Sequence, residues 1–163
     1  MTGRTGIVPG LPAAGTRPAA QPDADVMSRP VLRMSALDLA PLDTAVPSAR
    51  LHTRHIAREF GHAVLAGDCE LIVAELVTNA VQAVTGLGGA TGPPPIRLRL
   101  TRRDHGIQTE VWDGSDGMPN LHRTRPADDP GGWGLVLVDA LSSRWGTYRT
   151  AGGGKCVWAV IGG

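Results

Sequence analysis

Residues 75–81, which read Glu-Leu-Val-Thr-Asn-Ala-Val, carry the pattern that decides the fold. Glu75 and Asn79 lie four residues apart, so on a helix both side chains project from one face, and Gln82 continues this polar stripe. The rest of the helix is apolar, as in a helix that packs against a sheet. Because burial without partners is costly, the stripe must face solvent, a ligand or polar protein atoms. A wetted outer face explains the stripe alone equally well, but the apolar surroundings leave only a narrow polar window and favour a ligand.

Predicted strands and helices surround this central helix. The spacing of apolar residues predicts strands over 31–39, 96–101, 107–113, 144–150 and 155–161, and helices over 47–67, 68–85 and 135–143. Asp68 is the expected N-cap of the central helix. The turn at 104–106 is expected to join two strands as a hairpin. Residues 114–132 show no periodicity, which in a compact domain indicates a lid, a binding loop or a disordered segment.

Length and composition indicate one folded domain with a tail. The chain has 163 residues, of which 42% are hydrophobic, and this is enough to build a core. Residues 1–29 are rich in Gly, Pro, Ala and Thr, so they are predicted to be a disordered tail, and residues 30–163 form the predicted domain. A formal net charge of +1 excludes a global field that would attract nucleic acid or an anionic membrane.

Local patterns speak against two further classes of protein. One strand carries Arg97, Arg99, Arg102 and Arg103, but a single Tyr and a single Phe offer little to interleave with bases, so we favour a solvated sheet face over an RNA site. No apolar run approaches the roughly 20 residues that span a bilayer. The N-terminal residues lack the continuous apolar segment of a secretory signal. We therefore expect a cytoplasmic protein with no membrane partner.

The cysteines and histidines give no sign of metal or phosphotransfer chemistry. Cys69 and Cys156 lie far apart and are predicted to be reduced thiols in the core. His52, His55 and His62 share roughly one face of the first predicted helix. A phospho-accepting histidine would need a helical hairpin before the central helix, and only one helix precedes it. We interpret the three histidines as a solvated or partner-facing surface.

Two further clusters carry residues suited to a ligand. Residues 111–117 form a strand that ends in Asp113 and a flexible turn, where a carboxylate could accept hydrogen bonds from the amine of a base. An ordinary Asp-Gly turn explains this stretch alone better. Residues 131–135 read Gly-Gly-Trp-Gly-Leu and open the third predicted helix, where free backbone N–H groups could hold phosphate oxygens. A simple hinge is the alternative explanation of these glycines.

The order and spacing of the three clusters together resemble the GHKL family of ATP-binding domains, which have the Bergerat fold. The resemblance is closest to the single-domain anti-sigma-factor kinases and covers residues 45–161. Three C-terminal stretches add to it: 138–141, 145–146 and 154–159. It implies an α/β (α+β) fold, namely a two-layer sandwich in which helices cover one face of a mixed, mainly antiparallel sheet. It also implies ATP and Mg²⁺ as cofactors.

The resemblance assigns roles to two residues of the central helix and one strand end. Glu75 matches the acid that serves as general base, polarising a substrate hydroxyl or water. Asn79 matches the asparagine that coordinates Mg²⁺ bridging the ATP phosphates, a role suited to a hard oxygen ligand. Asp113 matches the aspartate that binds the adenine amine. These assignments place catalysis at Glu75 and both metal and cofactor binding at Asn79.

The remaining matches are glycines and one lysine. Gly117 matches the flexible glycine that follows the adenine-binding aspartate. Gly132 and Gly134 match the glycines that flank the lid and let backbone amides approach the phosphates. Lys155 falls near a late strand motif, where we expect a phosphate-binding or structural role.

The sequence departs from the family pattern at two positions. Ser115 stands where the pattern Asp-x-Gly-x-Gly has a glycine, which restricts the backbone and alters the expected adenine affinity. Trp133 stands where relatives often carry arginine, which removes a phosphate partner and leaves an aromatic face. Neither change removes Glu75, Asn79 or Asp113. The sequence therefore supports nucleotide binding more strongly than it supports catalysis.

The resemblance implies an anti-sigma-type regulator. Such a protein binds ATP, sequesters a sigma factor and phosphorylates a serine or threonine of an anti-anti-sigma partner, often as a homodimer, with no direct nucleic-acid contact. The main alternative is a nucleotide-responsive binding module without kinase turnover, which the two departures favour. A third, weaker alternative is an interaction protein that has lost the nucleotide.

Overall fold

The computed structural model describes residues 33–87, 92–117 and 134–163. In chain order these form β1 (Met34–Leu39), α2 (Ala45–Glu59), the 3₁₀ turn η1 (Ala63–Leu65), α3 (Ala66–Val84), β2 (Ile96–Arg103), β3 (Gly106–Asp113), α4 (Gly134–Leu141), β4 (Arg144–Arg149) and β5 (Lys155–Gly162). The predicted tail at 1–29 lies outside the described residues, as do most of the predicted loop, Gly132 and Trp133.

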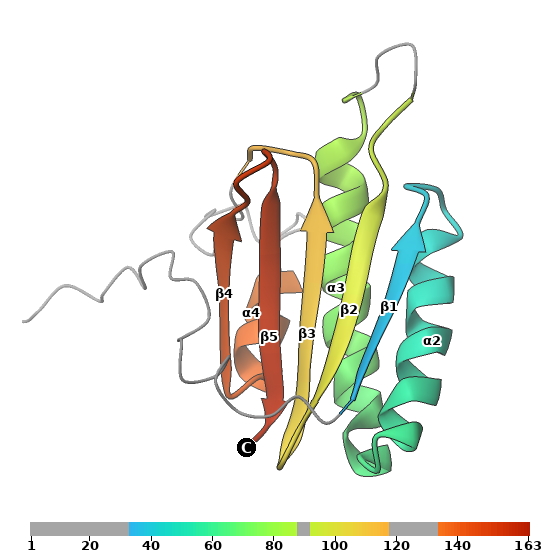
Figure 1. The fold of residues 1–163 in the computed structure, drawn as a ribbon, viewed down its shortest axis with the longest axis vertical. Helices are drawn as coiled ribbons and strands as arrows, with labels where there is room; N and C mark the ends of the chain where they lie inside the picture. The colour runs from blue at the N-terminus through green and yellow to red at the C-terminus, as the bar shows by residue number, and fades with distance from the viewer. Residues whose placement is uncertain (1–32, 88–91, 118–133) are drawn as a thin grey trace, which may run out of the picture.

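The strands form one sheet in the order β1-β2-β3-β5-β4, and the two-layer fold predicted from the sequence is confirmed (Figure 1). All pairings in this sheet are antiparallel, whereas we predicted a mixed, mainly antiparallel sheet. The difference arises because α4 and β4 carry the chain from β3 to the sheet edge, and β5 then turns back beside β3. β2 and β3 form the predicted hairpin, which turns at Asp104 and His105.

One face of the sheet is covered by α2, α3 and α4, and the main core lies between these two layers (Figure 1). Alternate residues of each strand point into this layer, as the pleat requires. The largest fully buried apolar side chains include Ile72 and Leu76 of α3 and Leu98, Leu100 and Ile107 of the hairpin. Burial of each such side chain contributes roughly 1.5–3 kcal/mol to stability. The apolar surface of α3 therefore fixes which way Glu75 and Asn79 can point.

The opposite face of the sheet carries a second, smaller apolar cluster. Its buried members are Cys156, Trp158 and Val160, and Trp112 and Tyr148 pack against them. Arg99 stacks 4.6 Å from the Trp112 ring centroid, and its guanidinium donates two hydrogen bonds of 2.7 Å to the buried Glu110 carboxylate. Arg97 at the strand end is exposed, as expected, but Arg99 is not. The prediction of a solvated face is therefore correct for only part of the arginine run.

The first two helix boundaries differ from the prediction. α2 ends at Glu59 rather than at residue 67, because Gly61 adopts a φ of +81° and turns the chain away. Val64, which we placed on the helix, lies in η1 and is 95% exposed. α3 begins at Ala66, so Asp68 lies in its first turn and is not the N-cap. The helix dipole still favours an acidic residue in the first turn.

The histidines do not form the shared surface that we predicted. His62 lies beyond α2, and its Nε2 donates a hydrogen bond of 3.1 Å to the carbonyl oxygen of Arg103. His52 is partly buried 3.1 Å from Ser35 Oγ, and burial lowers its pKa. His55 remains at the surface beside Glu59. The apolar spacing continues past Gly61 although the backbone turns there, so spacing alone places His62 on the helix with the other two.

Two further observations concern membrane spans and the two cysteines. None of the described helices is both long enough and apolar enough to span a bilayer. Cys69 and Cys156 are free and buried, as predicted, and burial raises the pKa of each thiol to about 12. Both thiols are therefore uncharged side chains of the packed interior at neutral pH.

Candidate functional site

Glu75 and Asn79 lie one turn apart on α3, on the side of the helix that is not sealed by the sheet. Both side chains are half-buried, while Gln82 is exposed. Neither Glu75 nor Asn79 has a hydrogen-bond partner among the described residues. Their apolar neighbours on α3 are fully buried, so the two polar groups are left at the rim of the core with unused acceptor oxygens.

Gly134 brings the start of α4 against Glu75. A Cβ atom added to Gly134 would lie 2.4 Å from Glu75 Oε2, so any larger residue would have to displace the carboxylate. The contact joins a glycine and an acid that the sequence places 59 residues apart. Two of the three predicted clusters are thereby brought together.

Asp113 ends β3 and faces the helix layer. Val111, two residues earlier, belongs to the main core, whereas Trp112 belongs to the opposite face, and side chains alternate along a strand. α3 runs beside β3, and its C-terminal half lies toward the end of the sheet at which β3 finishes (Figure 1). Asp113 therefore lies on the same face of the sheet as Glu75 and Asn79, toward one end of α3.

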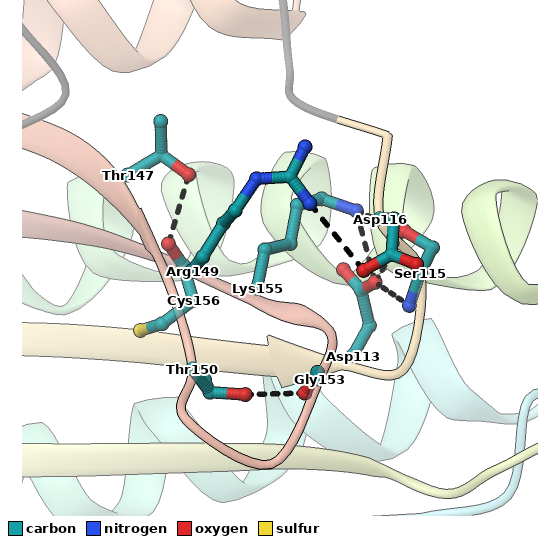
Figure 2. Close-up of polar contacts among 9 residues, drawn as sticks. All are labelled: Asp113, Ser115, Asp116, Thr147, Arg149, Thr150, Gly153, Lys155 and Cys156. Atoms are coloured by element: carbon teal, nitrogen blue, oxygen red, sulfur yellow. Dashed lines mark hydrogen bonds and ion pairs between the residues drawn. The ribbon is translucent and has the colours of Figure 1, made fainter.

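The Asp113 carboxylate is held by three donors from two residues. Its Oδ1 accepts hydrogen bonds from the Ser115 backbone N–H at 2.9 Å, the Ser115 hydroxyl at 2.6 Å and Lys155 Nζ at 2.9 Å (Figure 2). Lys155 Nζ also contacts Ser115 Oγ. The Lys155 and Asp113 side chains are only 5% and 1% exposed. We call Asp113, Ser115 and Lys155 the strand-end cluster.

The positions of Lys155 and Ser115 bear on two expectations. We expected a phosphate-binding or structural role, and the structure shows Lys155 paired directly opposite Asp113 in the β3–β5 ladder. Ser115, expected to restrict the backbone and to alter the adenine affinity, supplies two of the three hydrogen bonds. Sequence reasoning missed this cluster because it did not predict that β3 and β5 are neighbours. The signal available was a lysine that opens an otherwise apolar strand.

The turn between β4 and β5 presses against the strand-end cluster. Gly154 has a φ of +80°, and a Cβ atom there would lie 2.3 Å from the Asp113 carbonyl oxygen. Only glycine meets both conditions without strain. At the edge of the same turn, Arg149 forms an exposed ion pair of 3.4 Å with Asp116.

Two predicted glycines are not tested in the same way. Gly117 lies after the strand-end cluster, and no atom lies within 4 Å of where its Cβ would be. The structure therefore leaves room for a side chain at this position, and glycine is not required there by packing. Gly132 lies outside the described residues, so of the two glycines predicted to flank the lid only Gly134 is described.

A groove of about 460 Å³ opens on the other face of the sheet. It is lined by Asp38, Pro94, Pro95, Arg97, Arg99, Trp112, Asp113, Gly114, Thr150 and Gly153. Arg97, Arg99 and Trp112 point away from the helices, so this groove is separated from Glu75 and Asn79 by the sheet. Of the three predicted clusters it includes only residues 112–114, so this groove does not bring the clusters together.

The donor atoms of α3 fit a magnesium ion that a ligand completes. Glu75 and Asn79 offer hard oxygen donors, and Mg²⁺ in phosphate-binding sites is held by one or two protein oxygens with the rest of its shell from phosphates and water. The described residues include no cluster of three His, Cys, Asp or Glu side chains that could hold a metal alone.

Comparison with known families gives a match over most of the chain. The model of the histidine kinase-like ATPase domain matches residues 39–161, from the end of β1 to the body of β5. No curated protein matches the chain. The matched range contains α3, Gly134 and the strand-end cluster, and it starts within the predicted domain of 30–163.

Proposed function

The chain belongs to the histidine kinase-like ATPase family, and on this premise we propose that it binds ATP with Mg²⁺ on the helix-covered face of the sheet. In this proposal Asp113 accepts a hydrogen bond from the adenine amine. Gly132 and Gly134 let the backbone approach the phosphates, and Gly117 is the flexible glycine that follows Asp113. α3 then supplies the groups that act on the terminal phosphate.

The contact between Gly134 and Glu75 carries the proposal. The two residues come from distant parts of the chain, yet they approach so closely that only glycine leaves the carboxylate in place. Packing of the apolar core does not require an acid at this point, since Glu75 is half-buried and has no protein partner among the described residues. A group left without a partner beside a helix N-terminus is well placed to act on a phosphate ligand.

Asn79 would hold Mg²⁺ through its side-chain oxygen, and the ion would offset charge on the ATP phosphates. Glu75 would accept the proton of a hydroxyl nucleophile as the γ-phosphoryl group passes to it and ADP leaves. We infer that the hydroxyl belongs to a serine or threonine of an anti-anti-sigma partner and that the protein sequesters a sigma factor in the cytoplasm. This finer assignment rests on the sequence resemblance at residues 75–81 and 113–134.

A second candidate is a nucleotide-responsive module without kinase turnover. The observation that favours it is Ser115, which replaces a flexible glycine and is buried against Asp113 and Lys155. A rigid turn at this point suits tight binding of a base more than the movements of a turnover cycle. Binding of ATP would then alter the affinity for a protein partner without transfer of phosphate.

Titration calorimetry of the whole chain with ATP and Mg²⁺ is the first test. We expect saturable, Mg²⁺-dependent binding, and the absence of any heat of binding would contradict the proposal. Incubation with γ-labelled ATP and candidate antagonist domains then separates the two candidates. Transfer to a serine or threonine supports the kinase, whereas ATP binding with no transfer to any candidate supports the module.

Glu75→Gln provides the control for chemistry. It removes the proton acceptor and keeps the shape of the side chain, so transfer should fall by about 100-fold or more while ATP still binds. Glu59→Gln makes the same chemical change on the exposed surface of α2 and should alter neither property. If both variants transfer phosphate at the rate of the unmodified protein, Glu75 is not the base.

A further inference from the structure

The strand-end cluster contains a buried lysine that the assigned roles do not use. Lys155 lies within hydrogen-bond distance of Asp113 Oδ1, and its side chain is almost completely buried. An ammonium group in such a place is costly unless it is paired and hydrogen-bonded. An apolar residue would continue the pattern of β5, whose next six residues are buried. The lysine therefore calls for an explanation that involves the carboxylate it meets.

The two oxygens of the Asp113 carboxylate differ in their hydrogen bonding. Ser115 N–H, Ser115 Oγ and Lys155 Nζ all meet Oδ1, and no donor among the described residues meets Oδ2. Rotation of the carboxylate would break all three contacts. Oδ2 is thus the acceptor that remains for a ligand, and its direction is fixed before the ligand arrives.

We propose that Lys155 is a positioning residue that holds Asp113 with Oδ2 turned toward the ligand as a hydrogen-bond acceptor and thereby makes the site select purines with an amine at C6 over purines with an oxygen there. The proposal rests on the proposed function, in which Asp113 meets the base. It adds the group that determines the selectivity. An ionised carboxylate accepts from a 6-amino group but faces a second acceptor in a 6-oxo purine.

The selectivity would depend on Lys155 through the direction of the free carboxylate oxygen. Lys155 Nζ is the charged donor among the three that hold Oδ1, and Oδ2 is thereby turned toward the ligand. Without Lys155, Oδ2 is no longer held toward the 6-amino group, so the affinity for the 6-amino purine falls toward that for the 6-oxo purine. A purely structural lysine would change stability and leave the ratio of the two affinities unaltered.

Calorimetric titration of the full chain with MgATP and with MgITP, which differ at C6, tests this directly. We expect the unmodified protein to prefer ATP by about 10- to 100-fold, the range for one hydrogen bond to a charged group. Lys155→Met should reduce the ratio to below about 3-fold, with most of the change in the affinity for ATP. Lys155→Arg keeps the charge and should retain a preference of about 10-fold.

Arg149→Met is the matched control. It removes a cation from the same β4–β5 turn, where Arg149 pairs with the exposed Asp116, and it should leave the ratio unchanged. If Lys155→Met does not fold, Ser115→Ala takes its place, because it removes one donor to Oδ1 and should lower the ratio about threefold. An unchanged ratio in Ser115→Ala would then overturn the proposal.

The outcomes separate this inference from the proposed function. If neither nucleotide binds, both fail. If ATP binds but ITP binds equally well, or if Lys155→Met folds and keeps the full preference, the role of Lys155 is wrong and ATP binding stands. Loss of the preference in Lys155→Met, with retention in Lys155→Arg and Arg149→Met, supports the inference.

Discussion

The strand-end cluster and the polar pair on α3 lie on the same face of the sheet and differ in one respect. At the strand end, Asp113 and Lys155 are buried and hydrogen-bonded to each other and to Ser115. On α3, Glu75 and Asn79 are half-buried and have no hydrogen-bond partner among the described residues. The polar groups of the strand-end cluster are hydrogen-bonded to one another, whereas the polar atoms of Glu75 and Asn79 remain available to a ligand.

The difference teaches which residues the fold needs and which only the ligand needs. Removal of one member of a buried, paired cluster leaves an uncompensated charge, so it affects folding as well as binding. Removal of a half-exposed group without partners leaves nothing unsatisfied, so it affects only the ligand. Four predictions test this contrast, from the largest expected effect on stability to the smallest.

Lys155→Met is expected to have the largest effect. It strands the Asp113 carboxylate in the interior, which costs about 3–5 kcal/mol of unfolding free energy and lowers Tm by about 10 °C. Urea unfolding followed by circular dichroism measures the change. The double variant Lys155→Met with Asp113→Asn should recover part of the loss, because no charge is left unpaired. A loss below about 1 kcal/mol in the single variant would contradict the contrast.

Gly154→Ala should have the next largest effect. Its φ of +80° disfavours any side chain, and the new Cβ would collide with the Asp113 carbonyl oxygen. The expected loss of stability is about 1–3 kcal/mol, again by urea unfolding. Gly152→Ala in the same turn meets no atom within 4 Å and should change stability by less than about 0.5 kcal/mol. Equal losses in both variants would show that the turn does not press on the cluster.

The pair between Arg54 and Glu70 provides a weaker ion pair for comparison. Two hydrogen bonds of 2.6 and 2.7 Å from the half-exposed Arg54 guanidinium hold the pKa of Glu70 below its usual 4.5. The pair therefore stabilises the fold above pH 4.5, and this stabilisation is lost as the pH falls through the lower pKa of the folded state. In Glu70→Gln, urea unfolding measured from pH 6 to pH 3 should show a flatter decline. An unchanged slope would mean that the pair contributes nothing.

Asn79→Ala should have the smallest effect on stability, within about 0.5 kcal/mol of the unmodified protein. With saturating MgATP, the unmodified protein should gain stability by about RT ln(1 + [L]/Kd), and the variant should lose most of that gain. Differential scanning calorimetry with and without MgATP measures both. If Asn79→Ala unfolds as readily as Lys155→Met, the pair on α3 is structural and the contrast fails.

The sequence was sufficient for the elements that local pattern controls. The hairpin of β2 and β3, the apolar surface of α3 and the glycine at the start of α4 follow from alternation, helical spacing and turn chemistry. The end of α2 was placed eight residues too late, because apolar spacing continues past Gly61 even though the backbone turns there. The spacing of apolar residues does not reveal that Gly61 adopts a left-handed conformation, because apolar residues continue after it at helical spacing.

The part of the site that depends on strand order could not be predicted. Asp113 and Lys155 are 42 residues apart, and they meet only because β5 lies between β3 and β4. The expectation that Glu75, Asn79 and Asp113 share one site came from the family resemblance, which assigns all three to one bound nucleotide. A pairing across the sheet needs the order of strands, which neither composition nor spacing determines.

The position of β4 at the sheet edge has a consequence for solubility. An edge strand offers unpaired backbone groups to any other extended chain, and proteins protect such edges with charge. β4 begins with Arg144 and ends with Arg149, which pairs with the exposed Asp116, so charged side chains stand at both ends of this edge strand. Replacement of both arginines by threonine should therefore promote concentration-dependent association through strand-to-strand pairing.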